Sequence, residues 1–149
     1  MEGELLFLAQ TDTTVGFLST SNDKLSRIKE RPASKNFITE VASFTELKRL
    51  VRVPKRQRKM LRHSTGCSFI QTKANFSFRV PKEPKQHLNF IAKFGAIYST
   101  SANLSGQKFS IDFANSVCDV MIIDKRGFEE KRPSTVLKLG KRKLKKIRG

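Results

Sequence analysis

The sequence predicts a single α/β domain with a mixed sheet, covering residues 1–149. Short apolar segments that suit buried strands alternate with segments of helical periodicity, and no internal repeat or long linker divides them. The chain has 149 residues, of which 38% are hydrophobic and 12 are Phe. That length and composition are sufficient for a hydrophobic core.

The first expected element is a buried strand over Leu5–Ala9. A hydroxyl-rich segment, Gln10–Phe17, follows it. Ser21–Glu30 has two apolar residues on one helical face and predicts a short helix. Pro32 lies just beyond this segment, where it would end the helix because proline lacks the amide hydrogen.

The next strand is expected over Phe37–Ala42. Ser43 with Glu46 three positions later forms a capping box, which predicts the start of a second helix. This helix is expected to bury Leu47, Leu50 and Val51. Pro54 interrupts it.

Two strands, Cys67–Thr72 and Asn75–Val80, are expected around a tight turn near Lys73. In the second strand, Phe76 and Phe78 alternate with Ser77 and Arg79, which is typical of a half-buried strand. A helix follows over Glu83–Phe94, with Leu88, Ile91 and Phe94 spaced for burial. Gly95 is expected as its C-terminal cap.

Three further strands are expected in the last third of the chain, over Val117–Ile123, Ser134–Leu139 and Lys143–Ile147. Between the first two of these, Asp124–Pro133 is charged and nearly free of apolar residues. This segment is predicted to be a mobile loop.

The chain is strongly basic, with 30 Lys and Arg against 13 Asp and Glu, a formal net charge of +17. Such an excess favours polyanionic partners, above all nucleic acid or nucleotides. The acidic start does not suit a signal peptide, and no apolar segment approaches the roughly 20 residues of a membrane span. We therefore expect a cytoplasmic protein without a membrane partner.

The sulfur and imidazole ligands are too few for a structural zinc site, so no protein-bound metal is predicted. Cys67 and Cys118 lie far apart and are expected to be reduced, in or near the core. His63 has only Cys67 at a suitable spacing. His87 has no nearby ligand and is predicted to be a surface helix residue.

The segment Ser99–Gly106 follows the apolar run Phe94–Tyr98 and is rich in hydroxyl and amide groups. Small polar residues at the carboxyl end of a buried strand are typical of ligand sites in α/β sheets. The alternative is a Ser/Asn-rich turn. Upstream, Lys29 and Arg31 near Pro32 suit a polyphosphate, or else form a solvated helix end.

Together these motifs resemble the YrdC-like family, the threonylcarbamoyl-AMP synthases. Ser99–Gly106 matches STSANxSG, and Lys29–Pro32 matches K-x-R-P. Weaker matches in the family's order are Thr11-Asp12-Thr13 with Gly16, Arg79-Val80-Pro81, and Ser134-Thr135-Val136 followed by Arg148-Gly149. The resemblance implies the YrdC-like fold, an open twisted mixed sheet with flanking helices.

The resemblance also implies the activity: L-threonine, bicarbonate and ATP with Mg²⁺ give threonylcarbamoyladenylate and pyrophosphate. The product serves tRNA modification through a downstream threonylcarbamoyl transferase. No residue is assigned as a general base. The threonine-binding residues would be Thr13, Arg79, Ser99 and Ser134. The ATP-binding residues would be Lys29, Arg31, Lys35, Ser101, Asn103 and Arg148.

The chain departs from the family pattern at several positions. Gln10 and Asn36 each stand where the family has a proline, and Val15 or Gly16 replaces a tyrosine. Ser64-Thr65-Gly66 replaces a Pro-Gly-Pro turn. These changes leave open whether the chain is an active enzyme or keeps only the binding surface.

Two basic clusters are predicted to contact structured RNA such as tRNA, because phosphate neutralisation drives such binding. The residues are Arg52, Lys55, Arg56, Arg58, Lys59 and Arg62, and in the tail Lys141, Arg142, Lys143, Lys145 and Lys146. The alternative for each cluster is a solubilising surface. Two rival functions stay open: a non-catalytic RNA-binding module on the same fold, and another carbamoyl-adenylate chemistry, as in hydrogenase maturation proteins.

Overall fold

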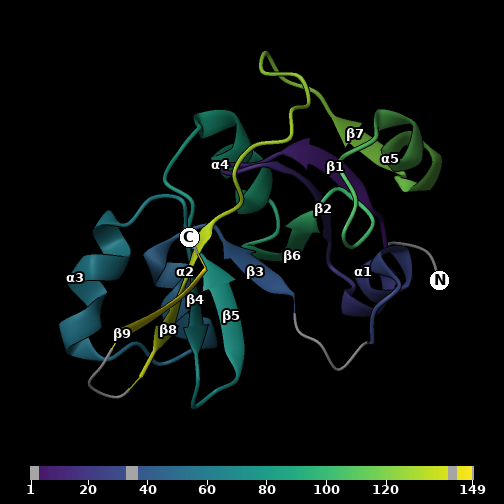
Figure 1. Ribbon diagram of the computed structural model, residues 1–149. Helices are drawn as coiled ribbons and strands as arrows, with labels where there is room; N and C mark the ends of the chain where they lie inside the picture. The colour runs from purple at the N-terminus through teal and green to yellow at the C-terminus, as the bar shows by residue number, and fades with distance from the viewer. Residues whose placement is uncertain (1–3, 33–36, 141–143, 149) are drawn as a thin grey trace. The chain divides into compact units, whose positions relative to one another are not determined.

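The computed structural model describes residues 4–32, 37–140 and 144–148 (Figure 1). The chain separates into two compact units. Unit 1 comprises residues 1–37 and 97–133, and unit 2 comprises residues 38–96 and 134–149. Each unit has its own hydrophobic core.

Unit 1 is a four-stranded sheet with two helices. Its strands are β1 (Phe7–Gln10), β2 (Val15–Ser19), β6 (Ala96–Ser101) and β7 (Val120–Ile122), and its helices are α1 (Asn22–Lys29) and α5 (Ile111–Val117). The order is β7-β1-β2-β6, with β7 parallel to β1 and the other pairs antiparallel. Leu25 of α1 and Ala114 of α5 are buried in one core with Leu8 and Phe17 of the sheet.

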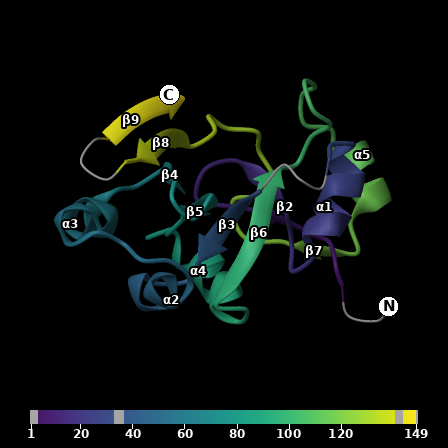
Figure 2. The same ribbon diagram turned by 90° about the horizontal axis from the view of Figure 1, so that it is seen from below.

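Unit 2 is a five-stranded sheet with three helices. Its strands are β3 (Ile38–Val41), β4 (Cys67–Gln71), β5 (Phe76–Arg79), β8 (Thr135–Leu139) and β9 (Leu144–Arg148), and its helices are α2 (Phe44–Leu50), α3 (Lys55–His63) and α4 (Lys85–Ala92). The order is β3-β5-β4-β8-β9. β3 is parallel to β5 and β4 to β8, whereas the other two pairs are antiparallel. Figure 2 shows β8 and β9 side by side in yellow.

The α/β class and the mixed strand directions are confirmed. The N-cap at Ser43 is confirmed, since its hydroxyl accepts from the amide of Glu46 at 3.1 Å. The C-cap of α4 is Lys93 rather than Gly95. Gly95 lies two residues farther on with a φ of +75°, and its amide donates to the Ile91 carbonyl at 3.0 Å. The expectation of one domain over residues 1–149 stays a prediction.

Several elements differ from the expectation. β2, α3 and α5 were not predicted, because each lies within a segment whose hydroxyl, basic or polar residues masked the apolar pattern. Leu50 is 52% exposed and Phe94 is 37% exposed, so both predicted burials are wrong. The predicted burial of Ile91 is confirmed, Leu88 is half-buried, and α4 also buries Phe90.

The alternation in β5 also fails to predict burial. Phe78 and Arg79 are both buried although they point to opposite faces, so this strand is covered on both sides at its carboxyl end. Likewise, β6 continues through Ser101, so Ser99 lies within a strand rather than after it. Ser99 pairs with Leu18 of β2, and this pairing satisfies the main chain of a polar segment.

The predicted mobile loop, residues 124–133, is attached to the end of β1. The Arg126 guanidinium donates to the carbonyl oxygens of Gln10 and Thr11 at 2.6 and 2.8 Å. The Gln10 side-chain amide bonds both the amide and the carbonyl of Glu129. Gln10, which replaces the family's proline, therefore holds this segment in place, and the mobility of the loop stays a prediction.

Cys67 and Cys118 are free thiols and half-buried, as expected. The longest of the helices in residues 4–32, 37–140 and 144–148 is α3, with nine residues. A membrane span takes about 20 residues, so none of these helices could cross a bilayer.

Candidate functional site

In unit 1, the predicted site residues meet around the ammonium group of Lys29. Lys29 is the last residue of α1, and its Nζ donates to the carbonyl oxygen of Ser101 at 2.9 Å and to that of Asn103. The side-chain oxygens of the same two residues lie farther away, at 3.5 and 3.3 Å. The K-x-R-P and STSAN motifs, 72 residues apart, are thus joined mainly through main-chain oxygens.

The environment of Lys29 is unusual for a helix end. Its side chain is only 4% exposed, so the interpretation as a solvated helix terminus is wrong for this residue. Burial, and secondarily the charge of Arg31, lower the pKa of Lys29 from its ordinary value of 10.5 to about 8. The ammonium is therefore mostly protonated at neutral pH, but it loses its proton at a lower pH than a surface lysine does.

Arg31 follows immediately after the helix. Its guanidinium carbon lies 3.7 Å from the centre of the Phe37 ring, a cation–π arrangement that fixes the side chain. Burial lowers the pKa of Arg31 below its ordinary value. The helix ends through Glu30 in the left-handed region, which turns the chain so that Arg31 leaves the axis.

The loop after β6 is closed by its own side chains. Asn103 Nδ2 donates to the carbonyl of Leu104 at 3.0 Å, and the Ser105 hydroxyl donates to the carbonyl of Lys29 at 3.4 Å. Thr13, in the β1–β2 turn of the same unit, is half-buried and its amide donates to the Thr11 hydroxyl at 3.1 Å. Unit 1 thus combines a buried cation with a hydroxyl-rich loop.

In unit 2, the predicted site residues belong to a row of polar side chains that crosses the sheet. We call it the unit 2 row. Its members are Glu40 on β3, Arg79 on β5, Ser68 on β4, Ser134 before β8 and Arg148 on β9, with His87 of α4 beside Glu40. The strand register explains the row, because Glu40 pairs with Arg79 in the ladder.

The centre of the row is an arginine held by two neighbours. Arg79 Nη2 lies 3.2 Å from Glu40 Oε2, and Nη1 donates to the Ser68 hydroxyl at 3.1 Å. The Ser68 and Ser134 hydroxyl oxygens are 2.7 Å apart. All four residues are buried, so their pairing avoids the large cost of isolated buried charge.

The far end of the row is Arg148. Its Nε donates to the Ser134 carbonyl at 3.0 Å and its Nη2 donates to the Ser134 hydroxyl at 3.1 Å. Arg148 is exposed as a whole residue, and partial burial of its guanidinium, followed by the charge of Arg79, lowers its pKa. The guanidinium groups of Arg79 and Arg148 are therefore close enough to repel each other electrostatically. Two neighbouring cations favour the binding of an anion.

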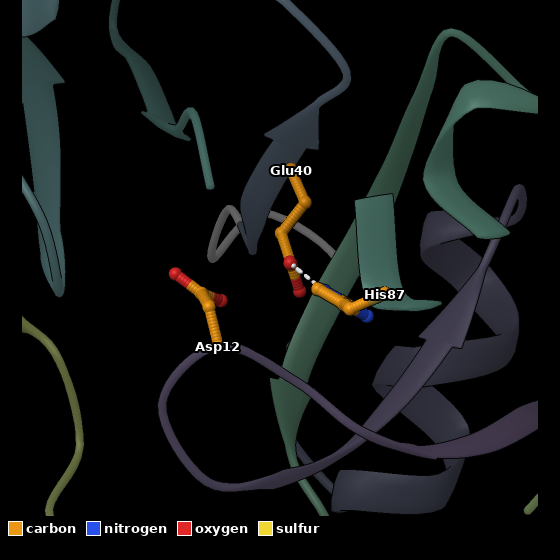
Figure 3. A group of neighbouring side chains, drawn as sticks. All are labelled: Asp12, Glu40 and His87. Carbon is orange, nitrogen blue, oxygen red and sulfur yellow. Dashed lines mark hydrogen bonds and ion pairs between the residues drawn. The ribbon is translucent and has the colours of Figure 1, made fainter. Parts of the chain in front are cut away.

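The near end of the row is a buried His–Glu pair. His87 Nε2 lies 2.6 Å from Glu40 Oε1, and Figure 3 shows this bond as a dashed line. The prediction that His87 is a surface residue is wrong, since it is 2% exposed. In α4, His87 shares its buried face with Phe90 and Ile91, three and four residues later.

Other predicted residues lie elsewhere. Ser99 is buried within β6 and makes strand contacts to β2. Lys35 and, in the tail, Lys141, Arg142 and Lys143 lie outside the described residues. The remaining basic residues predicted to bind RNA lie on α3, just before it, or on β9.

A family model described as "Telomere recombination", covering the Sua5, YciO and YrdC proteins, matches residues 3–149. The chain belongs to the Sua5/YciO/YrdC family. This membership confirms the resemblance drawn from the STSANxSG and K-x-R-P motifs.

The chain is also similar to uncharacterized protein MG259 of Mycoplasma genitalium, with 34% identity over 101 residues. The alignment covers 68% of this chain and 21% of that protein. The chain therefore spans about a fifth of that relative's length.

Solved structures of the Sua5/YciO/YrdC family confirm the fold. E. coli YciO gives a TM-score of 0.77 at 19% identity, covering 97% of this chain and 82% of that one. P. abyssi Sua5 complexed with L-threonine gives 0.73 at 20% identity, covering 94% of this chain and 48% of that one.

The sequence motifs of this family member did not reveal Glu40, His87 or Ser68. Glu40 is the only carboxylate in the predicted strand Phe37–Ala42, and a charge within a buried strand indicates a partner. For His87, the helical spacing to Phe90 and Ile91 was an available indication. Ser68 carries no sequence pattern of its own.

Proposed function

We propose that the chain forms L-threonylcarbamoyladenylate from L-threonine, bicarbonate and ATP, for threonylcarbamoyladenosine modification of tRNA. The threonine amine and bicarbonate give a carbamate and water. A carbamate oxygen then attacks the α-phosphorus of ATP, the bond to the β-phosphate breaks, and pyrophosphate leaves.

The observation that carries this proposal is the Lys29 cluster. Its ammonium is buried, contacts only neutral oxygens of Ser101 and Asn103 among the described atoms, and lies beside Arg31. Such a site has excess positive charge in a low-dielectric setting, which stabilises phosphate groups and the charge developing on them. ATP enters as its Mg²⁺ complex, which reduces the repulsion between the two anionic reactants.

The unit 2 row supports the other half of the reaction. Arg79 and Arg148 supply two guanidinium groups, and the row contains one carboxylate, that of Glu40. Arginine binds carboxylates in a two-pronged geometry, so the proposed ligand of the row is the threonine or carbamate carboxylate. The L-threonine complex of P. abyssi Sua5, a structure with the same fold, supports L-threonine as a substrate in this proposal.

The experiment is incubation of the purified chain with ATP, Mg²⁺, bicarbonate and L-threonine. Pyrophosphate release and the adenylate are followed by a coupled assay and by mass spectrometry. We expect product that depends on both threonine and bicarbonate, and its loss in Lys29→Met. Arg27→Met is the matched control, because Arg27 is exposed in the same turn of α1. Absence of product from folded protein would contradict the proposal.

A second candidate function is binding of structured RNA, supported by the exposed cations of unit 2. Lys55, Arg56, Lys59 and Arg62 of α3 are exposed, as are Lys145 and Lys146 of β9. Gln57 of α3 donates to the Gly140 carbonyl at 2.9 Å, which ties α3 to the residue that follows β8. A hollow of about 830 Å³ beside α3 is lined by three cations, Arg52, Lys55 and Lys73. Arg58 is partly withdrawn, since its Nε donates to the Val53 carbonyl.

The RNA candidate is tested by binding to duplex RNA over a range of salt. Replacing Lys55 and Lys59 with alanine should lower the slope of log affinity against log salt by about one for each phosphate that the variant no longer neutralises. A variant of two cations outside unit 2, Arg27→Ala with Lys24→Ala, is the control. Equal reductions in both variants would indicate attraction to net charge alone.

A further inference from the structure

The unit 2 row contains two ionisable residues that the proposed carboxylate-binding function does not use, Glu40 and His87. Both are buried, and both carry groups that can be charged. Burial of such groups is costly unless each has a defined partner, so their presence requires a reason beyond packing.

The geometry identifies what these two groups act on. Glu40 uses its two oxygens on different partners: Oε1 lies 2.6 Å from His87 Nε2, and Oε2 lies 3.2 Å from Arg79 Nη2. Because a carboxylate can only accept, the imidazole donates through Nε2. The helix α4 thereby fixes the rotation of the Glu40 carboxylate, which is carried by a strand.

The fixed carboxylate in turn orients the guanidinium of Arg79. Glu40 on β3 engages Nη2, while Ser68 on β4 receives a hydrogen bond from Nη1. The ion pair from β3 and the hydrogen bond to β4 restrain the guanidinium from both neighbouring strands. Two-pronged recognition of a carboxylate depends on the plane of the guanidinium, since both N–H groups must point at the ligand together.

We propose that Glu40 and His87 are positioning residues that orient the Arg79 guanidinium for a carboxylate ligand; this inference rests on the proposed function. The charges agree with it. Within the row, the Glu40 carboxylate pairs with Arg79, and Arg148 lies near enough for the charge of Arg79 to lower its pKa, so the row keeps two cationic groups beside the proposed ligand. His87 acts through Glu40 and does not touch the ligand.

The test compares His87→Leu, which removes the donor, with His87→Gln, which places an amide donor at similar reach. In the adenylate assay, His87→Leu should raise KM for L-threonine about tenfold with kcat and KM for ATP nearly unchanged. His87→Gln should recover most of the loss. Equal changes in both KM values, or no rescue in folded His87→Gln, would overturn the proposal. If His87→Leu does not fold, Glu40→Gln replaces it, with the same selective rise expected.

A second measurement separates this inference from the proposed function. In nitrogen-15 NMR spectra, the Nη groups of Arg79 should give separate, slowly exchanging signals in the wild type and averaged signals in His87→Leu. Arg49 is the control, because it is 69% exposed and pairs only at the surface with Glu46. If the wild type forms no adenylate but Arg79 is ordered in this way, only the proposed function fails. Averaged Arg79 signals in the wild type would overturn the positioning role.

Discussion

Unit 1 and unit 2 hold their buried cations by different means. In unit 1, the main-chain carbonyls of a loop surround Lys29, and the side-chain oxygens of that loop lie farther from its ammonium. In unit 2, the guanidinium of Arg79 is held by the side chains of a carboxylate and a hydroxyl. The first arrangement depends on backbone shape, and the second depends on residue identity.

The difference has an electrostatic consequence. Carbonyl dipoles stabilise a cation but leave its net charge in place, whereas the Glu40 carboxylate cancels one unit of charge. We therefore expect single side-chain substitutions to change folding stability more in unit 2 than in unit 1. The pH should change folding stability more through unit 1, because the pKa of Lys29 is lowered.

The largest expected effect is that of Glu40→Ala. This change removes the carboxylate that pairs with the buried Arg79 guanidinium and should reduce the free energy of unfolding by about 3–5 kcal/mol. Arg49→Ala is the control, because its ion pair with Glu46 is exposed and should contribute well under about 1 kcal/mol. Chemical denaturation measures both. If Glu40→Ala lowers the free energy of unfolding as little as the control does, side-chain pairing does not hold Arg79 in the way proposed for unit 2.

The next effect is a pH dependence that originates in unit 1. Between pH 8 and 10.5 the unfolded chain keeps the Lys29 proton that the folded chain has released, so stability rises with pH. This gain in folding stability is absent below pH 8 and complete above pH 10.5. Relative to Lys29→Met, the wild type should gain up to about 3 kcal/mol across that range. A stability difference that does not change with pH would show that Lys29 has an ordinary pKa.

The smallest effects come from two serines that sharpen the comparison. Ser68→Ala removes an acceptor from Arg79 and a partner from Ser134, and should cost about 1–3 kcal/mol. Ser101→Ala keeps the carbonyl that binds Lys29 and should cost less than about 0.5 kcal/mol. Thermal unfolding of the two variants side by side checks this, and the reverse order would contradict the account.

The sequence predicted those features that depend on neighbouring residues along the chain. The cap at Ser43 and the strands around Lys73 follow from local propensities, and the structure has both of them. The family motifs predicted that Lys29, Ser101 and Asn103 belong to one site. No sequence pattern indicated that Lys29 would contact the other two through their carbonyl oxygens.

The unit 2 row could not be predicted in the same way. Glu40 and His87 are 47 residues apart, and their contact depends on α4 packing against β3. Arg79 was expected from the RVP motif, but its partners are set by which strands flank β5. The carboxylate of Glu40 in a buried strand was the one local indication of a charged partner. It did not indicate that the partner is Arg79.

The most direct test of the account is a pair of calorimetric titrations with a non-hydrolysable ATP analogue and with L-threonine. They are made on the wild type, Lys29→Met and Glu40→Gln. The account predicts a crossed result: Lys29→Met weakens the analogue far more than threonine, and Glu40→Gln weakens threonine far more than the analogue. Equal weakening of both ligands in both variants, or no binding to the folded wild type, would contradict it.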